Sequence, residues 1–175
     1  MKMILTALEP EDLELLYNIE NDASQWSVSS VNVPYSRYSL HDYISNQSND
    51  IYADKQVRLV VRVGDEHCKV ADMKAVGLAD LFNFSPEHMR AEVGIAVMAE
   101  ECGKGYGTKA IQMLKEYAFN VLHLHTLYAV VPFDNAPSLA LLRACGFNEE
   151  ILLREWLRDG DTWKDAIQLL LYNKK

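Results

Sequence analysis

The sequence is poor in cysteine and in basic residues, and it has no long apolar run. Among 175 residues only Cys68, Cys102 and Cys145 are cysteines, and their spacing fits neither a metal site nor a secreted disulfide framework. No apolar stretch is long enough to cross a membrane, and the N-terminal residues reach acidic side chains too early for a signal peptide. We therefore expect a cytoplasmic location, no metal and no membrane partner.

The charge balance is acidic, with 17 Lys and Arg against 25 Asp and Glu and a net charge of -8. Binding to a nucleic acid backbone requires clustered Lys and Arg, so nucleic acid is excluded as the main partner. An acidic field instead attracts cationic molecules such as amines. The length fits a single domain over residues 1–175.

The stretch 90–108 lacks the spacing of two well-known phosphate-binding loops. Neither GxxxxGK[ST] nor GxGxxG fits Gly103, Gly105 and Gly107. The stretch instead has an alternating strand pattern, then glycine at every second position, then a helical period. Such glycines let backbone amides approach a ligand, and a helix that begins there adds the positive end of its dipole. The pattern predicts a site for a phosphate or pyrophosphate, and the alternative is a flexible turn that binds nothing.

Periodicity and turn residues predict an α+β chain. Alternating apolar residues predict strands at 3–6, 57–63, 75–84, 93–97, 127–131, 151–157 and 163–172. A spacing of three to four residues predicts helices at 9–20, 40–46, 109–122 and 135–145, with 21–38 as a loop. Asp159-Gly160 predicts a hairpin between the last two strands.

The glycine loop resembles the acyl-CoA-binding motif of the GNAT acetyltransferases, [QR]-x-x-G-x-[GA]. Cys102, Gly105 and Gly107 stand on its defined positions, and Cys102 replaces the usual Gln or Arg. Downstream, Asn135-Ala136-Pro137-Ser138 followed by Ala144-Cys145-Gly146-Phe147 resembles the N-x-x-[SA]…G-F segment of the same family. The resemblance covers nearly the whole chain and is closest to the branch of spermidine and ribosomal-protein (RimJ/RimL-like) N-acetyltransferases.

This resemblance implies a fold and an activity. The fold is the acyl-CoA N-acyltransferase fold, a three-layer α+β sandwich with a mixed, mostly antiparallel seven-stranded sheet and about four helices. The strands at 93–97 and 127–131 are expected to splay apart and admit the cofactor. The activity is acetyl-CoA-dependent N-acetyl transfer to a primary amine by direct attack in a ternary complex. The acceptor is either a polyamine or other small amine, or a protein N-terminus.

The resemblance also implies a set of residues that hold acetyl-CoA. These are Ile95, Val97, Met98, Cys102, Gly103, Lys104, Gly105, Tyr106, Gly107, Thr108, Asn135, Ser138 and Arg143. The amides of 103–108 are expected to bind the pyrophosphate, and the amide of Ile95 or Val97 to polarise the acetyl oxygen. For Arg143 the alternative is an ordinary solvated position on a helix.

Glu92 is the expected catalytic base, because it begins the strand that is expected to splay, and a carboxylate can collect the proton of an ammonium acceptor directly or through water. The alternative is an edge charge paired with Arg90 or His88. His88 is a second possible base, since neutral imidazole is available at pH 7.

The general acid of the family has no counterpart at its usual position. Many members have a tyrosine four residues before the glycine of the G-F pair, and here that residue is Leu142. Ser138 on the same helix is the expected replacement. Cys145 has no His-Asn partner pattern, so we interpret it as a core residue at a helix end rather than as a nucleophile.

Two further hypotheses remain open from the sequence. The departures at Cys102 and Leu142 are also compatible with a CoA-binding sensor or regulatory module of weak activity, and an interaction protein without a ligand is a third possibility. Trp26, Tyr35 and Tyr38 are expected either to line an acceptor cleft or to anchor a surface loop.

The C-terminal hairpin suggests a way to form a homo-oligomer. Trp156, Leu157 and Trp163 are expected either to form a dimer face or to pack in the core.

Overall fold

The computed structural model of the chain describes residues 1–22 and 33–174, so Trp26 lies outside the described residues. The strands are β1 Lys2–Ala7, β2 Val57–Gly64, β3 Lys74–Ser85, β4 Arg90–Val97, β5 Thr126–Pro132, β6 Glu149–Asp159 and β7 Thr162–Tyr172. The helices are α1 Leu13–Glu20, α2 Arg37–Ser45, α3 Ile51–Asp54, α4 Tyr106–Asn120 and α5 Ala136–Ala144, with 3-10 turns at Pro10–Asp12, Val70–Asp72 and Ala99–Glu101. This order of strands and helices matches the sequence prediction except for the additional short helix α3.

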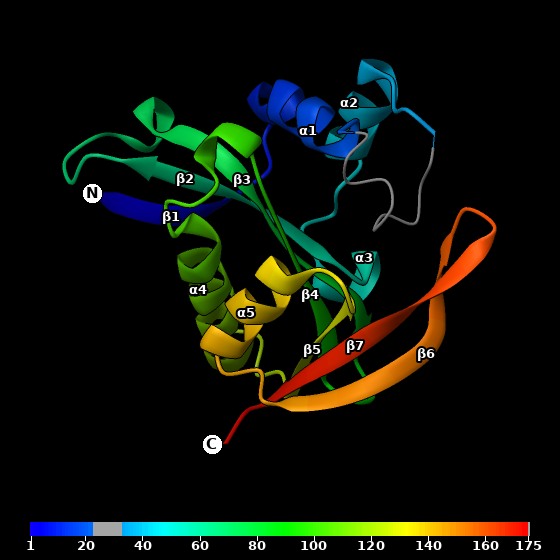
Figure 1. The fold of residues 1–175 in the computed structure, drawn as a ribbon. Helices are drawn as coiled ribbons and strands as arrows, with labels where there is room; N and C mark the ends of the chain where they lie inside the picture. Colours follow the sequence, from blue (N-terminus) through cyan, green and yellow to red (C-terminus); the bar gives the residue numbers. More distant parts are fainter. Residues whose placement is uncertain (23–32, 175) are drawn as a thin grey trace.

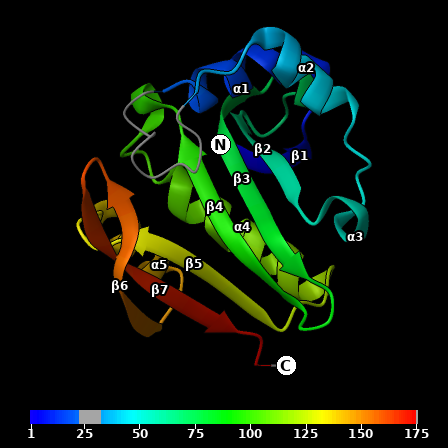
Figure 2. The ribbon, with the colours of Figure 1, turned by 90° about the vertical axis from the view of Figure 1, so that its right-hand side faces the viewer.

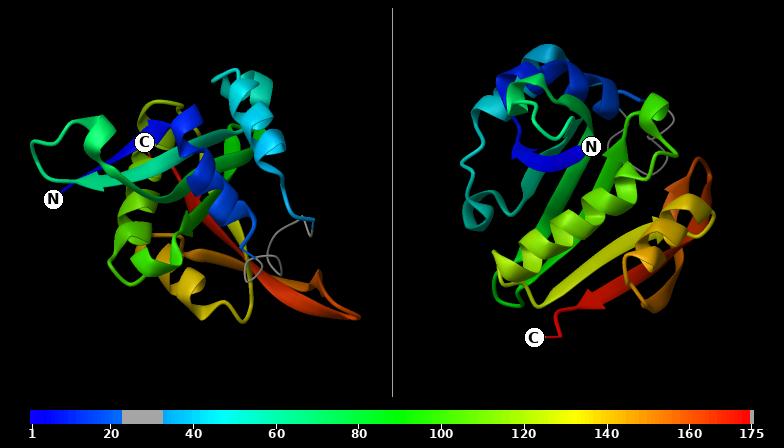
Figure 3. Two further views of the ribbon diagram at one scale, coloured as in Figure 1. Left: turned by 90° about the horizontal axis from the view of Figure 1, so that it is seen from above. Right: turned by 90° about the vertical axis from the view of Figure 1, so that its left-hand side faces the viewer.

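The seven strands form one mixed sheet in the order β1-β2-β3-β4-β5-β7-β6 (Figure 1). Every neighbouring pair is antiparallel except β4 and β5, which run parallel. Helices cover both faces of the sheet, with α4 and α5 on one face and α1 and α2 on the other (Figure 3). The predicted three-layer sandwich is confirmed.

Each face of the sheet has its own apolar core. The larger core joins α4 and α5 to the sheet, and its fully buried members include Ile111, Leu114, Leu127 and Phe147. The smaller core joins α1 and α2 to β2 and β3. Because the strands bury side chains on both faces, the sheet is held rigidly and its local irregularities can position functional groups.

Helix boundaries differ from the prediction where capping decides them. Helix α2 begins at Arg37 rather than Leu40, because the Ser36 side chain accepts a hydrogen bond from the Ser39 amide and caps the first turn. Helix α4 begins at Tyr106 rather than Lys109, directly after Gly105. The single-turn helix α3 was not predicted, and it brings the described helices to five.

The parallel strands β4 and β5 pair over a short distance only. Their paired residues are Arg90 with Thr126, Ala91 with Leu127 and Glu92 with Tyr128. Beyond Glu92 the two strands diverge, as Figure 2 shows. The expected splay is therefore present, and it begins at Glu92.

The C-terminal hairpin of β6 and β7 carries exposed aromatic residues. Trp156 and Trp163 are 58% and 60% exposed, so neither is a core residue, while Leu157 is half-buried. Among the described residues, no helix combines the length and the apolar character that a membrane span requires.

Replacing Phe147 with alanine should strongly destabilise the fold. The ring is 0% exposed within the larger core, so its removal leaves a cavity and should lower the free energy of unfolding by about 3–5 kcal/mol. Urea denaturation monitored by circular dichroism measures the change. Phe133→Ala is the matched control, because that ring is 61% exposed and its loss should change stability by less than about 0.5 kcal/mol. Equal losses in the two variants would contradict this account of the core.

Candidate active site

A groove of about 810 Å³ runs from the diverging edge of β4 across the first turns of α4 and α5. It is lined by all of the residues predicted to hold the cofactor except Lys104 and Arg143. Residues that the sequence did not predict also line it, and these are Asn18, Ile19, Asp22, Ala96, Ala99, Glu100, Glu101, Pro137 and Leu141. The groove therefore brings together the two motifs that are separated in the sequence.

The N-terminus of α4 offers unused amide groups to this groove. Its first intrahelical hydrogen bond runs from the Lys109 amide to the Gly105 carbonyl at 3.2 Å, so the amides of residues 106–108 have no acceptor within the helix. No side chain caps this end, and Gly105 has a left-handed φ of 80°. Helix α5 differs, because Asn135 Oδ1 accepts a hydrogen bond from the Ser138 amide at 3.2 Å and caps it. The uncapped end of α4 fits a pyrophosphate.

Gly107 allows α4 to approach its neighbours closely. A Cβ atom built at this position would lie 2.8 Å from Leu141 Cδ1 and 3.8 Å from Val97 Cγ2. The first distance is below any normal contact, so a side chain at this position would require the Leu141 side chain to move. The glycine of the motif thus also allows close packing between α4 and α5.

The diverging edge of β4 presents further backbone donors. The Met98 amide donates to the Val76 carbonyl of β3 at 2.9 Å. Because amide directions alternate along a strand in an antiparallel pair, the amides of Val97 and Ile95 point to the opposite edge, where β5 has already diverged. Both amides therefore face the groove edge, as the predicted role in polarising an acyl oxygen requires.

Lys104 and Arg143, the two predicted cofactor residues that do not line the groove, both form ion pairs. Lys104 Nζ lies 2.8 Å from Glu101 Oε2, and Lys74 pairs with the other oxygen of the same carboxylate. The two lysines lower the pKa of the Glu101 carboxyl. Arg143 forms a two-point ion pair with Glu150, at 2.6 and 2.9 Å. Contact of Lys104 or Arg143 with a phosphate stays a prediction.

Helix α5 carries the other predicted residues. Ser138 is half-buried and lines the groove, whereas Leu142 is 5% exposed and belongs to the larger core. Cys145 is 2% exposed, its thiol faces the Thr108 carbonyl at 3.6 Å, and burial raises its pKa. The interpretation of Cys145 as a core residue is confirmed.

A second cavity, of about 1250 Å³, lies on the face of the sheet that α1 and α2 cover in part. Its acidic lining residues are Glu20, Asp80 and Glu92, its basic ones are Arg58 and Arg90, and its aromatic ones are Tyr35, Tyr43, Phe82, Tyr128, Trp156 and Tyr172. Tyr35 thus lies where an acceptor cleft was predicted, while Tyr38 is 83% exposed on α2 and does not line the cavity. The cavity suits a molecule that is both cationic and partly apolar.

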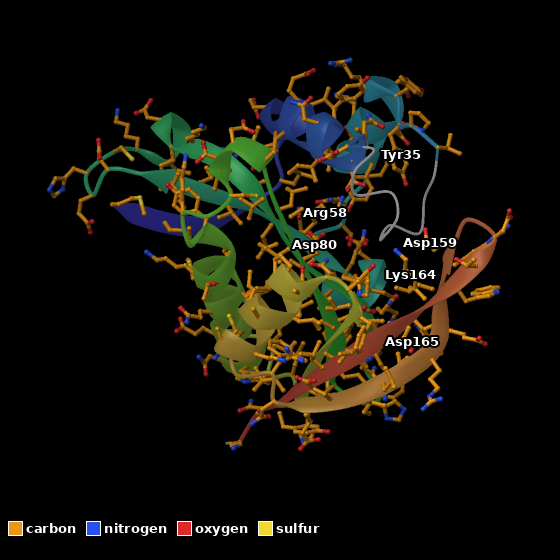
Figure 4. All side chains as sticks on the ribbon, in the orientation of Figure 1. Tyr35, Arg58, Asp80, Asp159, Lys164 and Asp165 are labelled. Atoms are coloured by element: carbon orange, nitrogen blue, oxygen red, sulfur yellow. The ribbon has the colours of Figure 1, made fainter. Side chains whose placement is uncertain are left out.

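Arg58 joins two of these carboxylates. Its guanidinium donates to both oxygens of Asp80, at 3.1 and 3.0 Å, and to Glu20 at 2.5 Å. Figure 4 labels Arg58 and Asp80 side by side below α1 and α2. One cation between two carboxylates leaves a net negative charge in this part of the cavity.

Glu92 lies where the splay opens. The Val130 amide of β5 no longer has a β4 strand opposite it, and it donates instead to Glu92 Oε1 at 3.3 Å. Asn83 Nδ2 donates to the other carboxylate oxygen at 3.0 Å. Burial raises the pKa of the Glu92 carboxyl above its ordinary value, and hydrogen bonds from Asn83, Val130 and Tyr128 oppose the rise. Its partners are therefore not Arg90 or the exposed His88.

Asn83 was missed by the sequence analysis, because a bulge in β3 sets the direction of its side chain. Leu81 and Phe84 are both buried in the larger core, yet they are three residues apart, and strict alternation would place them on opposite faces. The register of β3 against β4 shifts between Phe82 and Ser85, and Asn83 has a φ of 49° there. This bulge turns Asn83 toward Glu92.

Comparisons with known proteins agree with this geometry. The family model described as "Acetyltransferase (GNAT) domain" matches residues 2–148. Spermidine N(1)-acetyltransferase of Escherichia coli (strain K12) is 30% identical over 173 residues, which cover 96% of this chain and 84% of that protein.

Solved structures show the same similarity. Spermidine N-acetyltransferase from Vibrio cholerae, in complex with CoA and spermine, has a TM-score of 0.83 at 26% identity and covers 99% of this chain and 96% of that one. A dodecameric structure of spermidine N-acetyltransferase from Vibrio cholerae has a TM-score of 0.77 at 28% identity, with 97% and 93% covered.

The splayed sheet and the glycine-rich groove define an acyltransferase that binds coenzyme A. The chain belongs to the GNAT acetyltransferase family, and it is an acetyl-CoA-dependent N-acetyltransferase that acts on an amine.

Replacing Gly105 with alanine should weaken acetyl-CoA binding about tenfold. The residue has a left-handed φ, so a side chain costs about 1–2 kcal/mol and shifts the amides that follow it. Titration calorimetry with acetyl-CoA measures the affinity. Gly160→Ala is the control, because Gly160 also has a positive φ, of 59°, with open space around it, but lies at the tip of the β6–β7 hairpin. Unchanged affinity in Gly105→Ala would count against this anion site.

Proposed function

We propose that the protein acetylates a primary amine of a polyamine of the spermidine type. The relatives named above support this acceptor class, since they are a spermidine acetyltransferase and an enzyme in complex with CoA and spermine. The acidic charge of the chain and the aromatic, acidic lining of the larger cavity support it as well. A peptide N-terminus is the alternative acceptor.

One observation carries the proposal: Glu92 is a half-buried carboxylate with a raised pKa, at the start of the splay and in the wall of the acceptor cavity. In this proposal the Glu92 carboxylate accepts a proton from the ammonium group of the acceptor amine. A raised pKa brings the carboxylate closer to the working pH, which makes proton acceptance more efficient.

The other roles belong to groups that line the cofactor groove. Acetyl-CoA supplies an acetyl thioester when it is bound. The amides of residues 106–108 hold its pyrophosphate, and Asn135 and Ser138 contact the pantetheine. The amide of Ile95 or Val97 donates to the acetyl oxygen. With Leu142 buried in the core, Ser138 Oγ is the proposed proton donor to the departing CoA thiolate.

We further propose a homo-oligomer in the cytoplasm. The dodecameric structure from Vibrio cholerae and the exposed Trp163 of the C-terminal hairpin support the homo-oligomer. The free thiols of Cys68, Cys102 and Cys145 support a reducing compartment.

A thiol-release assay tests the acceptor class. Spermidine, spermine, aminoglycosides, amino acids and short peptides with free N-termini are compared at equal concentration with acetyl-CoA. We expect turnover with spermidine or spermine at least tenfold above the peptides. Turnover with peptides alone would refute the polyamine proposal. Acetyl-CoA binding without turnover of any amine would instead support a sensor.

Replacing Glu92 with glutamine tests the catalytic base. We expect kcat to fall about 100-fold and the acidic limb of the pH profile to disappear, because glutamine cannot accept the proton. In the wild type, kcat/KM should rise with pH as Glu92 ionises, and its raised pKa moves this limb above the pH range of an exposed glutamate. Glu87→Gln, in the exposed turn after β3, is the control. A fully active Glu92→Gln variant would remove the proposed base.

A further inference from the structure

Strand β6 contains an unusual bulge beside the acceptor cavity. Leu153 pairs with Ala166 and Leu157 pairs with Lys164, so the three residues 154–156 of β6 face Asp165 alone on β7. Within the bulge Glu155 has a φ of 48°, a left-handed conformation that is strained for a residue with a side chain. Such strain persists only where a specific contact holds it.

Asp165 supplies that contact. Its Oδ1 accepts a hydrogen bond from the Glu155 amide at 2.8 Å. The backbone of Asp165 is engaged on the other side, where its carbonyl accepts from the Phe133 amide at 3.0 Å. Aspartate is disfavoured within strands, and here it replaces the β7 backbone acceptor that the bulged strand can no longer reach. Figure 4 labels Asp165 on β7, next to the curved part of the hairpin.

The bulge changes which side chains reach the cavity. In a regular strand the neighbours Trp156 and Leu157 would point to opposite faces. In this structure both line the acceptor cavity, together with Leu153. The indole of Trp156 is 58% exposed, so much of its surface is open to a ligand.

The chemistry of the indole matches the acceptor. Tryptophan binds cations through its ring face more strongly than the other aromatic residues do, and it also packs against aliphatic chains. The same cavity holds Glu92 and the net negative cluster of Arg58, Asp80 and Glu20. A cationic amine in the cavity therefore has carboxylates on the sheet and an aromatic face on β6.

We propose that Trp156 is a specificity-determining residue for the amine acceptor, and that Asp165 is a positioning residue that seats Trp156 by holding the β6 bulge. This inference rests on the proposed function for the location of the acceptor, but it does not depend on which amine is the substrate.

Steady-state kinetics of Trp156→Ala and Asp165→Ala test the proposal, with spermidine or, if spermidine is not turned over, with the best amine of the panel. Each variant should raise the acceptor KM about tenfold while kcat and the KM for acetyl-CoA stay within twofold. Asp165→Asn should restore the wild-type KM, because its Oδ1 still accepts the Glu155 amide. The double variant should be no weaker than Trp156→Ala, since Asp165 acts through Trp156.

Trp163→Ala is the matched control, because Trp163 is equally exposed but does not line the cavity. Light scattering records the assembly state of every variant. An unchanged acceptor KM in either single variant would overturn the proposal, as would fully additive losses in the double variant. If Trp163→Ala raises the acceptor KM as well, or if the assembly dissociates when KM rises, the hairpin acts through oligomer contacts and the proposal is wrong. Failure of the polyamine proposal is distinguishable from failure of this inference, because the wild-type enzyme would then turn over a different amine and not spermidine.

Discussion

The separation of β4 from β5 is the constraint on which both cavities depend. Parallel strands normally continue their pairing, but here it stops after Glu92 and Tyr128. From that point the β4 amides that point toward β5 have no strand partner. The gap between the two strands lies between the helices α4 and α5 on one face of the sheet and the acceptor cavity on the other face. Both strands are anchored in the larger core, which contains Ala91 and Val93 of β4 and three residues of β5, at positions 127, 129 and 131.

Glu92 offsets the local free-energy cost of separating β4 from β5. The Val130 amide loses its strand partner at the splay, and a buried amide without an acceptor would be destabilising. The carboxylate accepts that hydrogen bond, and in doing so it becomes half-buried with a raised pKa. The same position thus satisfies the backbone and creates a proton acceptor in the acceptor cavity. In this way a structural requirement of the fold produces the group that we propose for catalysis.

The two helix N-termini at the groove are used differently. Helix α5 is capped by Asn135, so its first turn is satisfied before any ligand arrives. Helix α4 follows Gly105 without a side-chain cap and keeps its amides available. The positive end of the α4 dipole is therefore the one that is free to bind an anion. The presence or absence of a side-chain cap therefore distinguishes the N-terminus of α5, which is structural, from the N-terminus of α4, which is available for binding.

The sequence alone determined the features that depend on neighbouring residues. The strand and helix periods, the Asp159-Gly160 hairpin, the Asn135 cap and the glycine loop after β4 were all predictable, because local conformation and side-chain alternation decide them. Features that depend on pairing across the sheet were not. Asn83 reaches Glu92, and Trp156 reaches the acceptor cavity, only because β3 and β6 each contain a bulge. A bulge reverses which face a side chain occupies, and its position is set by contacts between strands that are far apart in the chain.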